Sequence, residues 1–276
     1  MKILTKKHLT IAIPLATVII IAGVWLSSTT VKSTQISSWV SSTPLPKALS
    51  DARMIQHSDA LYVIGGRSAS NSPLDTVWRS KLDEKGELTG WSAMTKLPAP
   101  LFYHQVATAG EDIFVSGGWD GTKARAEIWH STFHADGTIG VWSQVSTYGQ
   151  ALDLHGAIIV NNYLYIIGGW TGSDALNTVG YAPISSGNLG GWQSTSSLPV
   201  KLYRFSVSSY NNYIYLTGGV TDKNALNTDV YYTKPNPDGT LATWNKTKPL
   251  LEPRNLHASV VHDGRLVILG GLSGLN

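Results

Sequence analysis

Histidine and arginine side chains, which can hold an anion or move a proton, recur at matching places along the chain. Three histidines each lie 13 residues before the first glycine of a Gly-Gly pair: His104, His155 and His257. The arginines near the equivalent place are Arg53, Arg204 and Arg254. Guanidinium groups pair well with carboxylates, so this set could bind an anionic ligand such as a carboxylate sugar. The same side chains could instead bridge neighbouring repeats by hydrogen bonds.

The densest polar group lies in the segment LLEPRNLH, which contains Glu252, Arg254 and His257. Glutamate and histidine can act as general acid and base, and arginine can hold a substrate carboxylate. Residue type is the whole basis for this chemistry, because no longer catalytic motif surrounds the group. The sequence therefore assigns no catalytic residue.

Two tryptophans directly follow Gly-Gly pairs. Trp119 is followed by Asp120, and Trp170 is followed closely by Asp174. An exposed indole beside a carboxylate can hold a sugar by ring stacking and hydrogen bonding. Alternatively, these rings pack between neighbouring repeats. Both interpretations are open at the level of the sequence.

Metal and cofactor chemistry has little support. The chain has no cysteine, which excludes thiolate-bound zinc, thiol catalysis and disulfides. Asp120, Asp153 and Asp222 are acidic candidates, but Ca²⁺ needs roughly six to eight oxygen ligands and no loop has a dense Asp/Asn pattern. We expect no metal and no cofactor.

The candidate residues belong to a regular repeat. Gly-Gly pairs that end apolar runs begin at positions 65, 117, 168, 218 and 270, in steps of 52, 51, 50 and 52 residues. A tryptophan series has the same steps: Trp39, Trp91, Trp142, Trp192 and Trp244. Two landmarks that share one varying step indicate five copies of a structural unit.

Each unit contains candidate strands that alternate apolar and polar residues. The first begins at the histidine position, the second is the apolar run into Gly-Gly, and the third is a segment such as DTVWRSKL. The fourth begins at the repeated tryptophan. Turns such as ADG (135–137) and PDG (237–239) join the third and fourth strands, since glycine supplies the positive φ of a tight hairpin. The unit is therefore a four-stranded antiparallel meander.

The Gly-Gly after an apolar strand, the aromatic third strand and the tryptophan at fixed distance resemble the Kelch family over residues 39–271. The resemblance implies an all-β fold, a Kelch-type β-propeller of four-stranded antiparallel blades with five repeats. We expect the last blade to be incomplete, because there are five second strands but four third strands. If the ring closes, a strand at Trp39 joins this blade. Otherwise the ring is open, or a second chain closes it.

In such a propeller the fourth-to-first and second-to-third loops converge on one face near the axis. This face is the natural concave binding site, and it should carry the histidine, arginine and Trp-Asp candidates.

Two types of enzyme with a Kelch-like propeller bear on whether this chain is an enzyme. Chemistry like that of galactose oxidase is excluded, because its Cys–Tyr cross-link needs a cysteine. A sugar-modifying activity resembling that of sialic-acid mutarotases needs an acid, a base and an arginine, which Glu252, His257 and Arg254 could supply.

The N-terminal region differs from the repeats. Residues 1–8 carry Lys2, Lys6 and Lys7, and the run from Leu9 to Leu26 has no charge. Eighteen helical residues span about 27 Å, close to a bilayer core of roughly 30 Å. We expect one N-terminal hydrophobic helix at residues 9–26 that anchors the chain, with residues 1–8 cytoplasmic. A cleaved signal segment is the alternative. Residues 27–38 are expected to be a flexible stalk, and residues 39–276 the propeller.

Charge argues against nucleic acid as a partner. Without those three lysines, the 21 Lys and Arg residues fall to 18, equal to the 18 Asp and Glu residues, so the rest of the chain has no net charge that would attract nucleic acid.

The leading hypothesis is an exported, membrane-anchored binding module for a glycan or a protein partner. It would lie in the cell membrane with the propeller outside, or be secreted or periplasmic if the segment is cleaved. The alternatives are the sugar-modifying enzyme and a structural remnant of a longer propeller.

Overall fold

The computed structural model describes residues 41–275, which form strands, turns and loops without any α-helix. The predictions for residues 1–8, 9–26, 27–38 and Trp39 fall outside these described residues. Within residues 41–275, no helix is long and apolar enough to cross a membrane. The all-β prediction is confirmed.

Four antiparallel sheets follow one another along the chain, and we call them blades 1 to 4. Blade 1 contains β2 (Arg53–His57), β3 (Ala60–Ile64), β5 (Val77–Leu82) and β6 (Leu88–Ala93). Blade 2 contains β7 (Gln105–Ala109), β8 (Asp112–Ser116), β9 (Arg125–Thr132) and β10 (Ser143–Leu152). Blade 3 contains β11 (Gly156–Val160), β12 (Tyr163–Trp170), β13 (Ala175–Ser185) and β15 (Gln193–Ser194), with β14 (Asn188–Leu189) as an extra short pair on β13. Blade 4 contains β17 (Ser206–Tyr210), β18 (Tyr213–Thr217), β20 (Val230–Thr233) and β21 (Asn245–Lys246).

The strand order within a blade follows the sequence order. Each hairpin is antiparallel, and the third-to-fourth connection uses the predicted Asp-Gly chemistry. Gly137 and Gly239 have φ values of 77° and 85°, and the aspartate before each accepts a backbone N–H two residues further on, at Thr138 and Thr240. The meander predicted from the repeats is confirmed in blades 1 to 4.

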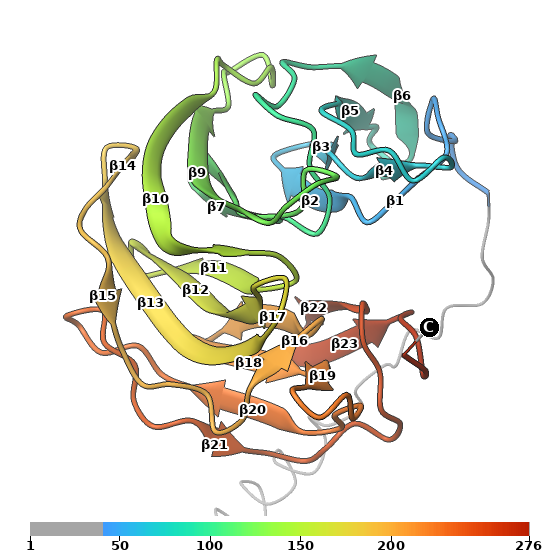
Figure 1. The fold of residues 1–276 in the computed structure, drawn as a ribbon. Coiled ribbons are helices and arrows are strands. Elements are labelled where there is room, and N and C mark those ends of the chain that lie inside the picture. The colour runs from blue at the N-terminus through green and yellow to red at the C-terminus, as the bar shows by residue number, and fades with distance from the viewer. Residues whose placement is uncertain (1–40, 276) are drawn as a thin grey trace, which may run out of the picture. The chain divides into compact units, whose positions relative to one another are not determined.

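The blades are arranged around a common centre in chain order, from β2 in blue to β23 in red (Figure 1). The first strands of neighbouring blades lie against one another, as β7 does against β11 and β11 against β17. Hydrophobic cores fill the interfaces between blades. Ile64 and Val77 of blade 1, for example, share a core with Trp142 of blade 2. The repeated tryptophan thus packs against the blade that precedes its own.

The fifth blade has only two strands among the described residues, β22 (Ala258–His262) and β23 (Arg265–Leu269). Within these residues the last blade is incomplete, and the strand expected at Trp39 lies outside them. The outer edge of β23 has no partner strand within residues 41–275. Apolar side chains of this two-stranded blade are exposed, since Leu269 of β23 is 45% exposed and Val260 of β22 is 47% exposed.

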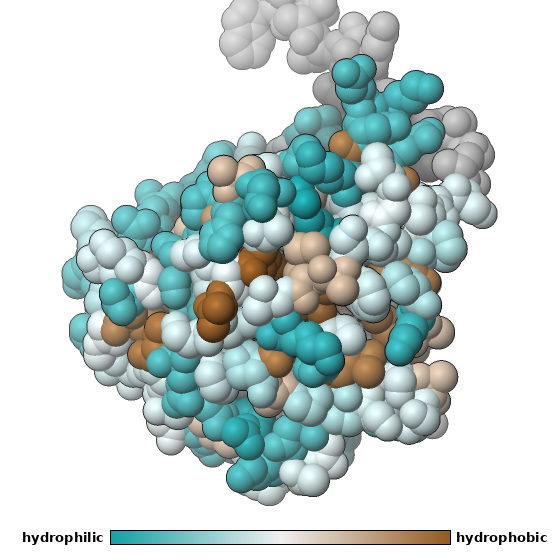
Figure 2. All heavy atoms as spheres, turned by 90° about the horizontal axis from the view of Figure 1, so that it is seen from above, coloured by the Kyte–Doolittle hydropathy of each residue, from teal (hydrophilic) through white to brown (hydrophobic). Residues whose placement is uncertain are grey.

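The surface seen from above is mostly hydrophilic or neutral, and hydrophobic residues form small, separate patches on it (Figure 2). This distribution matches the low charge of the chain, in which 14% of the residues are charged. The apolar residues are concentrated in the interfaces between the blades.

Candidate functional site: the loop face

Two sets of loops meet at one end of every blade, and we call this end the loop face. The segment before the first strand pairs with the segment after Gly-Gly of the same blade. In blade 1 this pair is β1 (Leu49–Ser50) with β4 (Arg67–Ser68), and in blade 4 it is β16 (Leu202–Tyr203) with β19 (Val220–Thr221). Single bridges join the equivalent segments elsewhere: Phe102 with Trp119, Asp153 with Trp170, and Asn255 with Leu272. The predicted convergence of the two loop sets is confirmed.

A row of residues with positive φ lies on this face, one in each blade. Each lies 14 residues before the first glycine of the pair, and we call these the rim residues: Asp51, Tyr103, Leu154, Arg204 and Leu256. Their φ values are 56°, 57°, 53°, 58° and 52°. A non-glycine residue in this region is uncommon and marks strain that the surrounding fold must hold.

Backbone hydrogen bonds link the rim residues across blades. The N–H of Leu154 donates to the carbonyl of Tyr103 at 3.1 Å, and the N–H of Arg204 donates to Leu154 at 3.0 Å. The N–H of Leu256 donates to Arg204 at 2.9 Å. The fold therefore holds the last four of these backbones in a fixed row, in which Leu154 is buried and the other side chains are partly exposed.

The predicted histidines lie directly below this row and are buried. His104 is 0%, His155 1% and His257 5% exposed. The ring of His155 contacts Ser116 Oγ at 2.9 Å, and the ring of His257 contacts Thr217 Oγ1 at 2.8 Å. Each hydroxyl belongs to the preceding blade, so the structure gives these rings the bridging geometry that was one of the two interpretations.

Burial keeps these rings neutral. It lowers the pKa of His104 to about 3, with Arg53 and His155 adding to the effect. It also lowers the pKa of His155 to about 3, and that of His257 to about 4 with a contribution from Arg254. A neutral, enclosed imidazole offers little to an anionic ligand.

The Gly-Gly pairs make room for these rings. A Cβ atom added at Gly65 would lie 2.7 Å from His104 Cε1, and one at Gly118 would lie 2.7 Å from His104 Cβ. Both glycines also have positive φ. The histidine and the glycines on either side of it therefore form one packing unit between neighbouring blades.

The predicted arginines have separate partners. Arg53 Nε donates to the carbonyl of His104 at 2.8 Å, and burial lowers the pKa of Arg53 to about 10, against an opposing effect of Asp51. Arg204 lies over the ring of Tyr203 at 5.7 Å and donates to the carbonyl of Leu275 at 3.3 Å. Arg254 donates to the carbonyl of Gly270 at 2.7 Å. These arginines do not converge on one point.

The residues considered for acid–base chemistry are also separated. Glu252 has a side chain that is 74% exposed and lies 3.8 Å from Arg254, whereas the ring of His257 is buried against Thr217. The structure does not bring the two groups into one cleft. Among the described residues, no cluster of three His, Asp or Glu side chains has the geometry of a metal site.

Trp119 and Trp170 are both half-buried on the loop face. The ring of Trp170 lies 5.0 Å from that of Tyr203 in the next blade, within a small apolar cluster. The carboxylate of Asp120 is engaged in its own loop, where it accepts N–H groups of Thr122 and Lys123. Arg125 pairs with it at 3.2 Å.

The structure adds Arg67, which the sequence argument missed, and it shows the environment of Asp153, which the sequence offered only as a candidate for calcium. Arg67 pairs with the rim residue Asp51 and lies over the rings of Phe102 and Tyr103, at 5.5 and 5.7 Å. Asp153 is 4% exposed, and burial raises its pKa to about 7, although Arg204 acts in the opposite direction. The rim residues directly precede the histidine position, so a comparison of the repeats extended by one residue would have found them.

Comparisons with known proteins agree with this architecture. A family model described as the Kelch motif matches residues 153–179. Kelch-like protein 25 of Xenopus tropicalis is 26% identical over 174 residues, which cover 60% of this chain and 28% of the relative. Kelch-like protein 21 of Danio rerio is 27% identical over 40% of this chain and 17% of its own length. The leucine-zipper-like transcriptional regulator 1 homolog of Drosophila melanogaster is 24% identical over 45% of this chain and 13% of its own length. The chain thus spans less than a third of each of these relatives.

Proposed function

Because the chain is a Kelch-repeat β-propeller, a type of protein-interaction module, we propose that it binds a protein partner through its loop face. One observation carries the proposal, namely the row of rim residues that the fold holds at positive φ. Strained backbone held by a rigid scaffold is typical of a functional surface. The packing of the blades below does not need the rim side chains to be of one type, since they are Asp, Tyr, Leu, Arg and Leu.

The chemistry of the loop face supports a protein partner. Tryptophan, tyrosine and arginine are the side chains that most often dominate protein interfaces. Arg67, Tyr103 and Trp119 are of these types, and Arg67 lies against Tyr103. Stacking of Arg67 on Phe102 and Tyr103 limits the motion of these side chains, so binding would cost less conformational entropy.

A glycan ligand has weaker support. Stacking on a sugar needs a free indole face and a nearby carboxylate with free oxygens. The ring of Trp170 already packs on Tyr203, and Asp120 is held by its own loop and by Arg125. The protein partner is therefore the better match to the geometry.

The place of this surface in the cell is part of the proposal. The uncharged run from Leu9 to Leu26, with basic residues only on its N-terminal side, supports a membrane anchor that leaves the propeller outside. Membrane fractionation followed by N-terminal sequencing tests it. We expect an intact N-terminus in the membrane fraction. A soluble product that begins after residue 26 would contradict the anchor.

Site-specific photo-crosslinking in intact cells tests the binding surface. A photoreactive residue replaces Trp119 on the loop face, or Lys85 in an exposed turn at the other end of blade 1 as the control. We expect a protein adduct from position 119 and none from position 85. Equal adducts from both positions would contradict a specific surface.

Thermal unfolding with a panel of sugars tests the alternative ligand. A sugar that raises the unfolding temperature, in the absence of any protein adduct, would identify a glycan site instead.

A further inference from the structure

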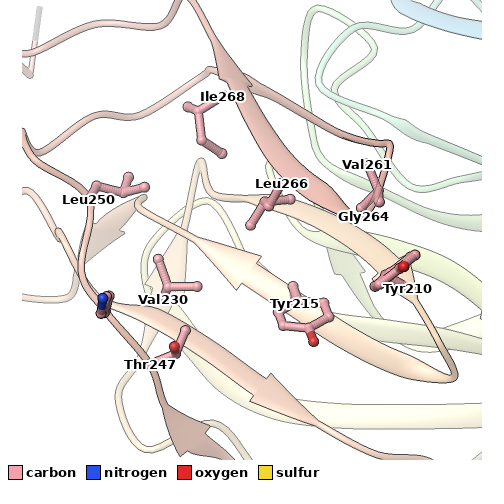
Figure 3. A pocket seen from close by; sticks show the side chains of 10 residues that line it. Tyr210, Tyr215, Val230, Thr247, Leu250, Val261, Gly264, Leu266 and Ile268 are labelled. Carbon is pink, nitrogen blue, oxygen red and sulfur yellow. The ribbon is translucent and has the colours of Figure 1, made fainter. Parts of the chain in front are cut away.

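Two cavities of similar size lie between blades, and their linings differ in chemistry. The first, of about 310 Å³, lies between blade 4 and β23, and its lining is mostly apolar, with Val230, Leu250 and Ile268 among its residues (Figure 3). The second, of about 380 Å³, lies between blades 1 and 2. Seven of the twelve residues that line it are Asp, Glu, Lys, Arg or His, so this second cavity is suited to a charged ligand.

The second cavity lies at the end of the blades opposite the loop face, and we call this end the turn end. The turn between β2 and β3 supplies Asp59, and β5 supplies Arg79 and Lys81. Blade 2 supplies Glu111 from the turn between β7 and β8, and residues 133–137 from its third-to-fourth turn. A ligand at the turn end would leave the loop face free, so this site is separate from the proposed partner surface.

Arg79 occupies a repeated position in the third strand. It lies opposite Tyr62 of the second strand, and its equivalents in blades 2 and 3 are His130 and Tyr181. The third-to-fourth turn of the following blade covers each of these three side chains with a glycine: Gly137, Gly187 and Gly239, respectively. The fold therefore encloses one side chain at this place in each of the three interfaces.

In blades 2 and 3 the enclosed side chain has a partner within the fold. His130 Nε2 contacts Asp112 Oδ1 at 2.7 Å, and the Tyr181 hydroxyl donates to Gln193 Oε1 at 3.1 Å. Arg79 differs, because within residues 41–275 it belongs to no ion pair and its Nε is buried without a hydrogen-bond partner. A buried donor without an acceptor is unfavourable, and an oxyanion in the cavity would supply the acceptor.

The carboxylates of the cavity lie at its mouth. Glu111 lies 3.1 Å from His57 Nε2, and Asp59 lies 3.7 Å from Lys81 Nζ. The side chains of Glu111 and Asp59 are 66% and 60% exposed, and Asp136 lies in an exposed turn. The cavity therefore has a negative mouth and an unpaired positive charge at its inner end.

The inner wall is held in place before any ligand binds. The Tyr62 hydroxyl donates to the carbonyl of Gly137 at 2.7 Å, which ties blade 1 to the turn of blade 2. The ring of His57 stacks on that of Phe133 at 3.9 Å. Burial raises the pKa of Tyr62, and the neighbouring Arg79 acts in the opposite direction. A guanidinium fixed between a phenol and a glycine turn loses little freedom on binding.

We propose that this cavity binds the carboxylate group of a small molecule, with Arg79 as the residue that pairs with it. A guanidinium binds a planar carboxylate through two parallel hydrogen bonds. The negative mouth favours this singly charged group over a phosphate, which carries more than one negative charge at neutral pH. A volume of about 380 Å³ is in the range of sites for small molecules.

Titration of the full-length chain with benzoate at constant ionic strength tests the site, with NMR of the benzoate protons as the readout. We expect saturable binding to the parent chain. Arg79→Gln should weaken it at least about tenfold, because the charged hydrogen bonds are lost. Arg265→Gln is the matched control, since Arg265 is exposed on β23 and should not affect binding. No saturable binding to the parent chain, or equal binding by Arg79→Gln, would overturn the proposal.

A variant at the mouth keeps the test valid if Arg79→Gln folds poorly. Asp59→Asn removes an exposed negative charge, so it should tighten benzoate binding about threefold, the size expected for one exposed charge. Asp174→Asn removes an exposed carboxylate of the loop face and should leave the affinity unchanged. An unchanged affinity in Asp59→Asn would mean that benzoate binds elsewhere.

Competition distinguishes the class of anion. Acetate should displace benzoate at a lower concentration than inorganic phosphate does, because phosphate meets stronger repulsion at the mouth. If phosphate is the better competitor, the choice of a carboxylate ligand is wrong.

Discussion

At the scale of single residues, the loop face contains a carboxyl group in an unfavourable environment. Asp153 is 4% exposed, and its Oδ1 has no hydrogen-bond partner in the structure. Burial raises its pKa to about 7, which outweighs the opposite effect of Arg204. Since the folded chain holds this proton more tightly than the unfolded chain, Asp153 lowers stability as the pH rises from about 4 to about 7.

The variant Asp153→Asn should therefore raise the unfolding temperature at pH 8 and leave it nearly unchanged at pH 4. Each unit of pKa shift corresponds to about 1.4 kcal/mol, so we expect a gain of several degrees. Thermal unfolding at both pH values measures it. Asp120→Asn is the control, and it should instead lower the unfolding temperature at pH 8, because the pKa of Asp120 is shifted downward. Burial alone would raise the pKa of Asp120, but hydrogen bonds from Thr122, Lys123 and Arg125 hold it well below its usual range. If Asp153→Asn lowers the unfolding temperature at pH 8, the Asp153 carboxylate has favourable partners in the folded chain, and this interpretation is wrong.

The histidine position offers a second residue-scale prediction, because blade 4 has Phe205 in the place of the histidine. Phe205 packs under Gly168 as His155 packs under Gly117. His155→Phe should cost about 1 kcal/mol, the contribution of the hydrogen bond to Ser116. His155→Ala should cost about 2–5 kcal/mol, because it leaves a cavity. Denaturant unfolding of both variants checks the order, and equal losses would contradict the packing role.

At the scale of the elements, the Gly-Gly pairs determine how closely blades approach. Gly118→Ala should destabilise the chain strongly, since its Cβ would lie 2.7 Å from His104 Cβ and its φ is 98°. Gly191→Ala is the control, because no atom lies within 4 Å of its Cβ position. We expect an unfolding temperature many degrees lower for Gly118→Ala and almost unchanged for Gly191→Ala. Similar values for both would mean that the blades can move apart at little cost.

The elements were largely predictable from the sequence, and the contacts between them were not. The third strand expected from DTVWRSKL is β5, Val77–Leu82, because alternation and turn chemistry are local properties. The histidine positions were also found, but their burial depends on glycines of two different blades. Apart from Arg204, the rim residues escaped notice because their common property is a backbone angle, while their side chains share no chemistry.

The separation of Glu252 from His257 has the same origin. A spacing of five residues puts two side chains near each other along the chain, but one belongs to an exposed loop and the other to a buried interface. Linear proximity is weak evidence for a shared cleft, because each loop residue takes the environment that the neighbouring blade provides.

At the scale of the whole molecule, the buried histidines lie in several blade interfaces and titrate together. Their pKa values of about 3, 3 and 4 lie below the ordinary 6.5, so the unfolded chain binds more protons below that pH. Their contribution to stability is fully present above pH 6.5 and is lost as the pH falls toward 4. Three histidines outweigh the opposite effect of Asp153 in this range.

We therefore expect the unfolding temperature to fall as the pH is lowered from 6.5 to 5. A variant with phenylalanine at positions 104, 155 and 257 should lose this dependence and become slightly more stable as the pH falls, because Asp153, with its raised pKa, then acts alone while the exposed carboxyl groups are already charged in this window. Calorimetry across the range measures the slope. A parent chain whose stability is constant between pH 5 and 6.5 would show that these rings are already accessible to protons.

The hydrogen-bonded row of rim residues has a consequence for molecular engineering. Five positions at nearly equal spacing share one backbone conformation, and the chain already places acidic, aromatic, aliphatic and basic side chains on it. Leu154 is buried in a small apolar cluster, and Tyr103 and Leu256 pack against the same cluster, so the fold constrains these three side chains. A library randomised fully at positions 51 and 204, and restricted to apolar residues at 103, 154 and 256, should yield folded proteins with new binding preferences, with the blades as a constant scaffold.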